Sequence, residues 1–465
     1  MRMNLLNLML LLLLACSKGG QAPAAPAPPV TPPTQPVETT PDQYGTPFNK
    51  VPDAADAVIY QVNMRAFSAA GDLRGVQQRL DSIRALGVNV VYLLPVYPVG
   101  VLKSVNSPYC IKDFNSVAPE FGTLDDLRAL VEDAHQHGMA VILDWVADHT
   151  AWDHPWITAH KDWYQQDGGG NIIAPPGTGW NDVAALNYKS TDLRKAMIKA
   201  MQSWIYTANV DGYRCDAADF VPHDFWVQAI DSLQKITTHK LLLYAEGTRK
   251  DQFQAGFQLE YGMGFYYTLK DKVFGAGASV KLIDSVNNAE YSGALPLSQV
   301  VRYTSNHDVN SSDGTPLELF GGRQGSLAVF TVAALMKSVP MLYNGQEIGC
   351  TQRLTYFNNS TPIDWTPAPD ITAAYKAILA FRSGSNAVKT GALASYSSDD
   401  VCVFTKTAGS KQVLVMANLR NKTVTYNLPA AIAPTGWRNA FDGSTATLAA
   451  AVALQPYEYR VLRND

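Results

Sequence analysis

The feature that most constrains the fold is a repeated alternation of short β-branched segments with amphipathic helical segments, which begins near residue 56. Such alternation indicates βα units and a parallel sheet. Eight strand segments fit the pattern: 57–62, 88–94, 140–144, 212–216, 241–246, 258–265, 300–305 and 339–343. Eight repeats over roughly 330 residues predict a closed (β/α)8 barrel. An open doubly wound sheet is the weaker alternative, because neither GxGxxG nor GxxxxGK occurs.

Two further regions interrupt or follow the repeats. The interval after the third strand is too long for a βα loop and contains Gly168-Gly169-Gly170 and Pro175-Pro176. It predicts a small inserted domain at about 148–188, within a barrel domain of 49–383. Beyond about 383 the helical spacing stops and short alternating segments take over, which predicts a C-terminal antiparallel β-sandwich over 384–465.

The N-terminal sequence predicts a targeting segment. One charge, Arg2, precedes an apolar run over 5–14 that is too short for a stable membrane span. The run ends at Ala15-Cys16, which resembles the lipobox of bacterial lipoproteins. We therefore predict a signal peptide over 1–16, a lipid on Cys16, and a Pro/Ala/Thr-rich linker over 17–48. The expected location is the bacterial cell envelope, anchored to a membrane on its periplasmic or cell-surface side; a conventional signal peptide is the alternative.

Composition excludes several partners. Lysine plus arginine number 37 and aspartate plus glutamate 41, a net charge of −4, so the chain has no basic excess for nucleic acid. The 47% hydrophobic and 17% charged residues are ordinary for a globular protein. The four cysteines after Cys16 lack metal-site spacing, and their disulfide state is left open.

Polar and charged residues gather at the ends of four of the expected strands. In a (β/α)8 barrel the C-terminal strand ends carry the chemistry, while the barrel interior holds aliphatic side chains. These residues are Asp144, Asp148 and His149 on the third strand, Arg214 and Asp216 on the fourth, Glu246 on the fifth, and His307 and Asp308 on the seventh. We expect them to converge at one end of the barrel.

The segments VILDWVADH (141–149), DGYRCDA (211–217), YAEG (244–247) and YTSNHD (303–308) resemble, in order and spacing, those of the α-amylase family of retaining glycoside hydrolases. SPY at 107–109 and PMLYNGQE at 340–347 are similar as well. The resemblance extends from about residue 57 to the C-terminus. It implies a (β/α)8 barrel with the inserted and C-terminal domains, and hydrolysis of α-glucosidic bonds in starch-derived glucans or maltooligosaccharides through a covalent glycosyl-enzyme intermediate.

The resemblance also implies roles for three acids: Asp216 as nucleophile, Glu246 as general acid/base and Asp308 as transition-state stabiliser. Retention requires two carboxyl groups about 5 Å apart, one ionised and one protonated. Arg214 lies two residues before Asp216 on the same side of the strand, so we expect it to keep Asp216 ionised. Glu246 has no such partner in the sequence, and we expect its pKa to be raised, as a proton donor requires.

Other positions match the family's substrate-binding residues. The resemblance implies that Tyr109 stacks on a sugar, that His149 and His307 bind its hydroxyls, and that Asp144 supports the pocket floor. Each has a structural alternative: Asp144 as an ion-pair partner, Tyr109 as core and His149 as a buried, satisfied histidine.

The chain departs from the family pattern at several positions. After Asp216 the family's usual lysine and histidine are replaced by Asp219 and Phe220. The asparagine that the family uses as a calcium ligand is replaced by Asp148, and Asp182 lies in a loop like the one that the family places near its calcium. Carboxylates suit calcium, so an ion near Asp148 and Asp182 is an open alternative, and no cofactor is required.

Two other functions share these features. A glucanotransferase or related transglycosylase would use the same acids and differ only in the acceptor of the glycosyl group. A non-catalytic glucan-binding lipoprotein would keep the barrel without the chemistry. The presence of all three acids favours the enzyme.

Overall fold

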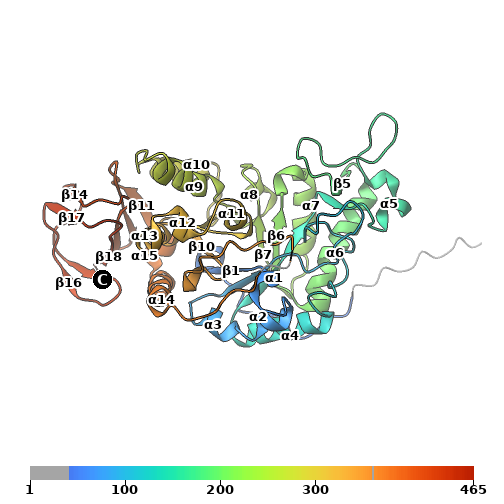
Figure 1. The fold of residues 1–465 in the computed structure, drawn as a ribbon, viewed down its shortest axis with the longest axis horizontal. Coiled ribbons are helices and arrows are strands. Elements are labelled where there is room, and N and C mark those ends of the chain that lie inside the picture. The colour runs from blue at the N-terminus through green and yellow to red at the C-terminus, as the bar shows by residue number, and fades with distance from the viewer. Residues whose placement is uncertain (1–40, 359–360, 465) are drawn as a thin grey trace, which may run out of the picture. The chain divides into compact units, whose positions relative to one another are not determined.

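A closed parallel barrel forms the centre of the computed structural model, which describes residues 41–358 and 361–464 (Figure 1). The strand order around the barrel is β1-β10-β9-β8-β7-β6-β3-β2. The strands are β1 (Ile59–Val62), β2 (Val90–Leu93), β3 (Ala140–Val146), β6 (Gly212–Asp216), β7 (Leu242–Ala245), β8 (Leu259–Tyr261), β9 (Gln299–Tyr303) and β10 (Val339–Tyr343). The predicted fold class is confirmed. Cys16 and the predicted signal peptide lie outside the described residues.

Every barrel strand is buried along its whole length, which explains the continuous apolar runs in the sequence. Gly212 at the start of β6 has a φ of 145°, and a Cβ atom there would lie 2.0 Å from the Leu242 carbonyl oxygen of β7. Only glycine permits this approach. It brings together the two strands that end near Asp216 and Glu246.

The expected strand over 258–265 is wrong in its second half. Only Leu259–Tyr261 pairs in the barrel, and residues Met263–Tyr267 form a helix, α9. Gly262 lies between the two, with its N–H bonded to the Val301 carbonyl and no room for a Cβ beside that oxygen. The apolar residues Phe265 and Tyr266 are therefore buried from a helix, which a short apolar run cannot distinguish from a strand.

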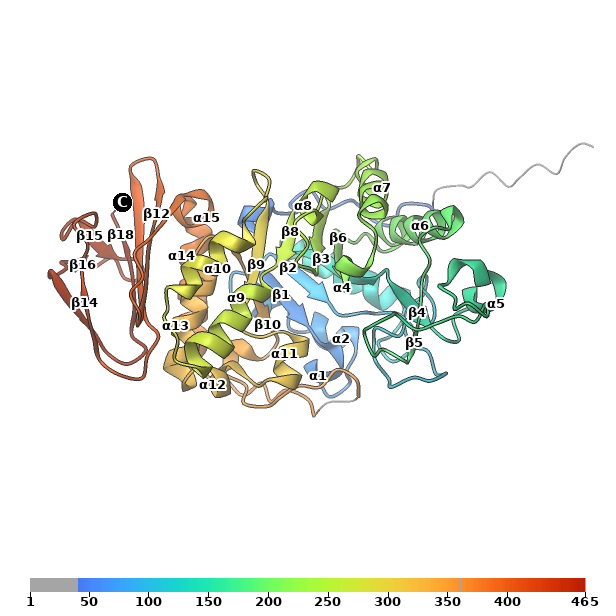
Figure 2. The ribbon, with the colours of Figure 1, turned by 90° about the horizontal axis from the view of Figure 1, so that it is seen from above.

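Helices alternate with the strands around the barrel (Figure 2). Thr123 caps α4, because its hydroxyl accepts from the Asp126 N–H and the Asp126 carboxylate accepts from the Thr123 N–H. The α-helices are α1 (Met64–Phe67), α2 (Leu73–Gln77), α3 (Leu80–Arg84), α4 (Leu124–Gln136), α6 (Thr191–Ala208), α7 (His223–Gln234), α8 (Gln252–Ala255), α9, α10 (Leu282–Glu290), α11 (His307–Ser312), α12 (Pro316–Leu319), α13 (Gly322–Leu335), α14 (Pro369–Gly384) and α15 (Asn386–Thr390). Short 3-10 helices are η1 (Ala54–Asp56), η3 (Ala218–Phe220) and η5 (Gln346–Ile348), and η4 (Thr268–Gly275) is a π-helix that continues α9.

The segment after β3 forms a small unit of its own. An antiparallel pair, β4 (His149–Ala151) and β5 (Val183–Ala185), encloses α5 (Trp156–Ala159) and η2 (Lys161–Trp163). Trp163 and Tyr164 are buried, and the Trp163 ring packs against Trp156 at 5.0 Å. Trp163 thus joins the hydrophobic core shared with the barrel, Trp152 and Trp156 pack partly buried against this core, and Trp180 faces a cavity.

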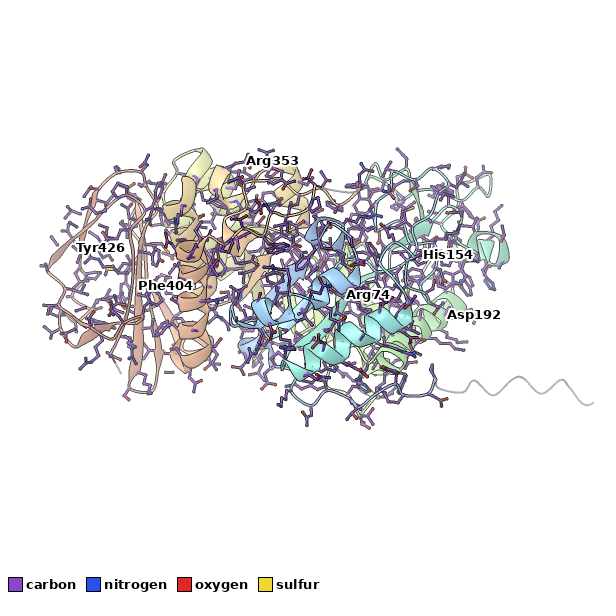
Figure 3. All side chains as sticks on the ribbon, turned by 60° about the horizontal axis from the view of Figure 1, so that its bottom comes forward. Arg74, His154, Asp192, Arg353, Phe404 and Tyr426 are labelled. Atoms are coloured by element: carbon purple, nitrogen blue, oxygen red, sulfur yellow. The ribbon has the colours of Figure 1, made fainter. Side chains whose placement is uncertain are left out.

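The C-terminal region is antiparallel, with a six-stranded sheet (β11-β12-β13-β18-β15-β16) and a two-stranded sheet (β14-β17). Phe404 lies on the barrel side of the larger sheet, and Tyr426 lies on its other side (Figure 3). The strands are β11 (Ala392–Ser395), β12 (Val401–Ala408), β13 (Lys411–Asn418), β14 (Val424–Asn427), β15 (Trp437–Asn439), β16 (Thr445–Ala446), β17 (Ala451–Leu454) and β18 (Tyr459–Arg463).

Across residues 41–358 and 361–464, no helix combines the length and apolar character needed to cross a bilayer.

We predict that the buried His154 in the inserted segment makes the free energy of unfolding fall at acidic pH. Burial lowers the pKa of His154 to about 4, and its Nδ1 accepts a hydrogen bond from the Trp156 N–H. The unfolded chain therefore binds more protons between pH 6.5 and pH 4, so stability falls as pH drops through this window. The contribution is about 2–3 kcal/mol. His154→Asn keeps an acceptor without titrating, and we expect urea unfolding of this variant to lose less stability between pH 7 and pH 4.

The exposed His160, whose ring stacks on Trp163, supplies the matched control. His160→Asn should retain the wild-type pH dependence of the unfolding free energy. An unchanged pH dependence in His154→Asn would show that His154 is not the titrating group.

Candidate active site

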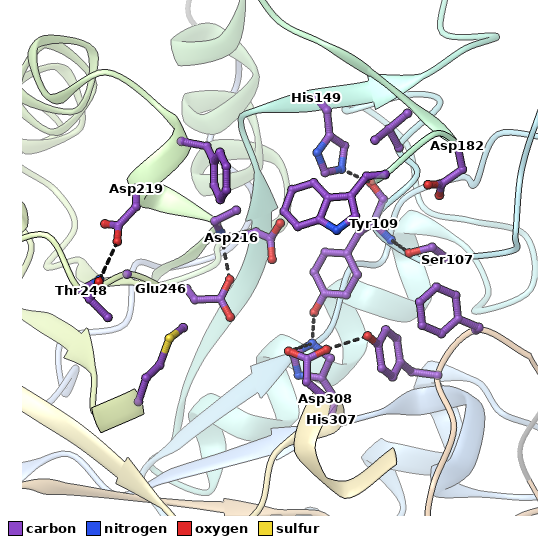
Figure 4. Close-up of a pocket in the computed structure, with 18 residues that line it drawn as sticks. Ser107, Tyr109, His149, Asp182, Asp216, Asp219, Glu246, Thr248, His307 and Asp308 are labelled. Carbon is purple, nitrogen blue, oxygen red and sulfur yellow. Dashed lines mark hydrogen bonds and ion pairs between the residues drawn. The ribbon is translucent and has the colours of Figure 1, made fainter. Parts of the chain in front are cut away.

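A cavity of about 490 Å³ opens at the C-terminal ends of the barrel strands (Figure 4). Seven of the predicted site residues line it: Tyr109, His149, Asp182, Asp216, Glu246, His307 and Asp308. Arg214 and Asp144 do not line the cavity and are completely buried. The convergence expected from the strand ends is therefore observed, for residues that lie at or just beyond the ends of β3, β6, β7 and β9 and for two residues from loops.

Local backbone structure fixes the positions of the three acids. Asp216 is the last residue of β6 and Glu246 directly follows β7, while Asp308 lies in the first turn of α11 after β9. The Asn306 side chain caps α11 by accepting from the N–H groups of Asp308 and Val309. Parallel strands place all three carboxyl groups at one edge of the sheet.

The residue after Asp216 has an unusual backbone conformation. Ala217 has a φ of 42°, in the left-handed region that costs energy for a residue with a Cβ atom. The turn directs the Ala217 N–H at Glu246 Oε2, 2.9 Å away. Backbone strain next to one carboxyl group thus orients the other.

Arg214 contacts three carboxyl groups. Its Nη1 lies 2.7 Å from Asp144 Oδ1 and 2.7 Å from Asp216 Oδ1, and its Nη2 lies 2.6 Å from Glu246 Oε1. The expectation that Glu246 lacks a cationic partner is wrong. The β6-β7 pairing, which the sequence does not reveal, places Arg214 opposite Tyr244 and thus close to both acids.

Burial has the largest effect on the pKa values of Asp216 and Asp308. Removal from water raises the pKa of Asp216, the charge of Arg214 opposes this rise, and the negative charges of Glu246 and Asp144 reinforce it. Burial also raises the pKa of Asp308, against the hydrogen bond that Tyr356 donates to it. Arg214 therefore restrains the pKa of Asp216 without bringing it to the value of an exposed aspartate.

A chain of hydrogen bonds fixes the proton positions around His307. Gln61 donates through Nε2 to His307 Nδ1 at 3.0 Å, so the ring proton lies on Nε2 and faces the Tyr109 hydroxyl at 2.7 Å. The Tyr109 hydroxyl in turn donates to Asp144 Oδ2 at 2.9 Å. Burial and the charge of Arg214 lower the pKa of His307 to about 3, so this histidine is neutral in the chain.

His149 has a different environment. Although burial opposes it, the Asp148 carboxylate raises the pKa of His149, whose Nδ1 lies 2.8 Å from Asp148 Oδ2. Its Nε2 faces the Tyr109 carbonyl oxygen at 3.1 Å. Both ring nitrogens can therefore act as donors, and together they hold the loop that presents Tyr109 to the cavity.

The residues considered for calcium supply few ligands. Asp148 Oδ1 is buried without a hydrogen-bond partner, the one feature that favours a cation there. Within the described part of the chain, no group of three or more His, Cys, Asp or Glu side chains is arranged to hold a metal ion. Calcium near Asp148 and Asp182 stays a prediction, and we derive no catalytic step from it.

Sequence reasoning missed two features of the site. Tyr356, in the loop after β10, donates to Asp308 Oδ1 at 2.6 Å, yet its surroundings in the sequence carry no motif. Asp219 lines the cavity, but its carboxylate oxygens are engaged by protein donors. They accept hydrogen bonds from the Thr248 N–H at 2.7 Å and from Gln252 Nε2 at 3.0 Å. Asp219 thereby ties the loop after β6 to the loop after Glu246, while Phe220 packs against Trp180 at 5.5 Å.

Comparisons with known proteins identify the family to which the sequence motifs point. A family model described as "Alpha amylase, catalytic domain" matches residues 40–171 and 178–377. Alpha-amylase MalA of Haloarcula japonica is 26% identical over 409 residues, covering 83% of this chain and 58% of the relative. Alpha-amylase 3 of Dictyoglomus thermophilum is 25% identical over 361 residues, covering 70% of this chain and 69% of the relative.

The fold is also that of a solved structure. The crystal structure of an alpha-amylase from Lactobacillus plantarum superposes with a TM-score of 0.79 at 24% identity, covering 88% of this chain and 99% of that one. At this identity the likeness concerns the fold alone. The chain spans less than two thirds of MalA, so the residues of the site, rather than the relatives, must indicate the activity.

Proposed function

The chain belongs to the α-amylase family of glycoside hydrolases, and from this premise we propose that it hydrolyses α-glucosidic bonds in starch-derived glucans or maltooligosaccharides with retention of configuration. The observation that carries the proposal is the contact of one guanidinium group, Arg214, with both Asp216 and Glu246. The contact places the two carboxyl groups side by side at one cavity, which is the arrangement that a retaining enzyme needs for its pair of carboxyl groups about 5 Å apart.

In the first step, Asp216 attacks the anomeric carbon and the glycosidic C–O bond breaks. Glu246 gives its proton to the leaving oxygen, so the departing sugar carries a hydroxyl group and Glu246 becomes a carboxylate. A glycosyl ester forms on Asp216. In the second step Glu246 takes a proton from water, the water oxygen bonds to the anomeric carbon, and Asp216 is released as a carboxylate.

Asp308 and its neighbours act on the charge that develops on the sugar ring. A negative carboxylate beside the ring stabilises an oxocarbenium-like transition state, and the Tyr356 hydroxyl fixes one oxygen of Asp308. We assign sugar-binding roles to Tyr109, His149 and His307, which line the cavity. Asp144 accepts from both Tyr92 and Tyr109 and thus supports the cavity from beneath the lining residues.

The direct test is the stereochemistry of the first product. Proton NMR during hydrolysis of a maltooligosaccharide should show the α-anomer before mutarotation, and the β-anomer would overturn the retaining mechanism. Chromatography of the products from amylose, pullulan and maltotriose, with and without an added acceptor sugar, separates hydrolysis from glucanotransfer. Measurable binding of these glucans without any product would instead indicate the non-catalytic alternative.

We also predict that Tyr356→Phe lowers kcat by about tenfold with little change in KM. Burial raises the pKa of Tyr356, so its hydroxyl keeps the proton that it donates to Asp308. Loss of a hydrogen bond to a charged group costs about 1.5 kcal/mol, which corresponds to that factor. Steady-state kinetics on a maltooligosaccharide measure the effect.

Tyr426→Phe is the matched control, because the Tyr426 hydroxyl donates to the Tyr396 carbonyl in the C-terminal domain. Its kcat should equal that of the wild type. Equal kcat values for Tyr356→Phe and the wild type would contradict the role of Tyr356.

We propose, finally, that the enzyme is a lipoprotein of the bacterial envelope, anchored through Cys16. The support is the apolar run over 5–14 that ends at Ala15-Cys16, followed by a linker rich in proline and alanine. Expression with radiolabelled palmitate should label the wild type and leave Cys16→Ser unlabelled and in the soluble fraction. Equal labelling of both would exclude Cys16 as the lipidation site.

A further inference from the structure

Four cationic side chains from separate segments act on one another between the barrel and the C-terminal sheet, and none of them lines the catalytic cavity. They are Arg302 of β9, Lys337 in the turn between α13 and β10, Arg382 of α14 and Lys406 of β12. Arg302, Arg382 and Lys406 have at most 1% of their surface exposed. Buried cations of this kind are rare unless anions compensate them.

The orientation of Lys406 follows from the alternation of side chains along β12. Cys402 and Phe404 pack into the barrel core, whereas Val401 and Val403 pack into the core of the C-terminal domain. Because side chains alternate along a strand, Lys406 shares the barrel-facing side with Cys402 and Phe404. Its ammonium group therefore lies inside the interface between the two domains.

The other three cations are held together around one short segment. Arg382 donates through Nη2 to the Ser338 carbonyl at 3.0 Å, and the Lys337 ammonium lies 3.8 Å from the centre of the Tyr291 ring. Arg302 is in register with Pro340 at the start of β10. Their charges act on Lys406, since burial together with Lys337, Arg302 and Arg382 lowers the pKa of Lys406 to about 7.

The carboxylates near the cluster already have partners. Glu290 pairs with Arg302 at 2.9 Å, and Asp56 pairs with Lys389 at 2.7 Å. Over residues 41–358 and 361–464, no carboxylate forms an ion pair with Lys337, Arg382 or Lys406. These three side chains thus have no carboxylate in direct contact, although the charge of Asp56 acts on Arg382 from farther away.

Donor groups in the cluster are also unused. Arg302 Nη1, Arg382 Nε and Arg382 Nη1 are buried and have no hydrogen-bond acceptor. A buried charged donor without an acceptor is costly, and one anion would satisfy the donors and the excess charge together. We propose that this cluster binds one small inorganic anion, halide or oxyanion, through Lys406, Arg382 and Arg302, and that the anion stabilises the junction of barrel and C-terminal domain.

The test compares thermal unfolding of the full chain with that of Lys406→Met, below pH 7, in a buffer whose only anion is the bulky gluconate. Titration with phosphate in one arm and bromide in another should raise the wild-type Tm by about 2–4 °C and then saturate, as expected for a bound ligand. The arm that saturates at the lower concentration identifies the anion as oxyanion or halide. Lys406→Met should show no saturable rise.

The behaviour of the variant in gluconate alone is diagnostic as well. Without a bound anion the wild type carries buried positive charge with no carboxylate in direct contact, so Lys406→Met should unfold at an equal or higher temperature there. The exposed Lys272 supplies the matched control, and Lys272→Met should retain the full saturable rise. A rise that is linear in salt and equal in all three proteins would be a general salt effect and would overturn the proposal.

If Lys406→Met does not fold, the anion can be located directly in the wild-type protein. Anomalous scattering from a wild-type crystal soaked in bromide should give a peak within hydrogen-bond distance of Lys406 Nζ and Arg382 Nη1. The absence of a peak, together with no saturable rise in phosphate, would overturn the proposal.

Discussion

Asp216→Asn is expected to lower kcat on maltooligosaccharides by at least about 10⁴-fold while the protein folds normally, a loss typical of a missing nucleophile. The amide cannot form the glycosyl ester, although its oxygen can still accept the hydrogen bond from Arg214 Nη1. Because burial raises the pKa of Asp216, a neutral side chain removes a desolvation cost, so the variant should be at least as stable as the wild type. Initial rates and thermal unfolding measure the two effects.

Asp81→Asn is the control for this substitution, since the Asp81 side chain is 91% exposed on the outer helix layer. It should change neither the rate nor the Tm. Undiminished hydrolysis by Asp216→Asn would refute the nucleophile assignment. A loss of activity accompanied by a large fall in Tm would show instead that Asp216 has a structural role.

The barrel could be predicted because its strands are buried on both faces and therefore appear as unbroken apolar runs. The convergence of Asp216, Glu246 and Asp308 could be predicted because parallel strands bring their C-terminal ends together, whereas the roles assigned to the three acids came from the resemblance to the α-amylase family. The short strand β8 could not be delimited, because Phe265 and Tyr266 continue the apolar run into a helix. Local periodicity does not separate a strand from a buried helix over so few residues.

Contacts between elements were beyond prediction for a different reason. The pairing of Arg214 with Glu246 depends on the register of β6 and β7, and the contact of Tyr356 with Asp308 depends on the path of a loop that contains no repeated pattern. Likewise, Asp219 shows in the sequence only that the family's lysine is absent. Only the structure reveals that Asp219 joins two loops, because the hydrogen bond from the Thr248 N–H links residues that are far apart in the sequence.

Arg214→Leu is expected to have the largest combined effect on activity and stability. Removing the guanidinium leaves Asp144, Asp216 and Glu246 buried without their shared counter-charge, and loss of one partner from a buried ion pair costs about 3–5 kcal/mol. Arg214 also opposes the rise in the pKa of Asp216, so its loss raises that pKa further and reduces the ionised fraction of the nucleophile. Urea unfolding and the pH profile of kcat measure the two consequences.

The pH dependence distinguishes this electrostatic role from a simple packing defect. Groups whose folded-state pKa is raised contribute stability below their unfolded pKa and lose it as pH rises, so the destabilisation by Arg214→Leu should be larger at pH 7 than at pH 4. The residual activity should likewise have its acidic limb moved to higher pH. Arg74→Leu, which removes an exposed partner of Asp126, should alter neither profile. A destabilisation by Arg214→Leu that is equal at both pH values would mean that lost packing, and not the charge of Arg214, holds the three acids in place.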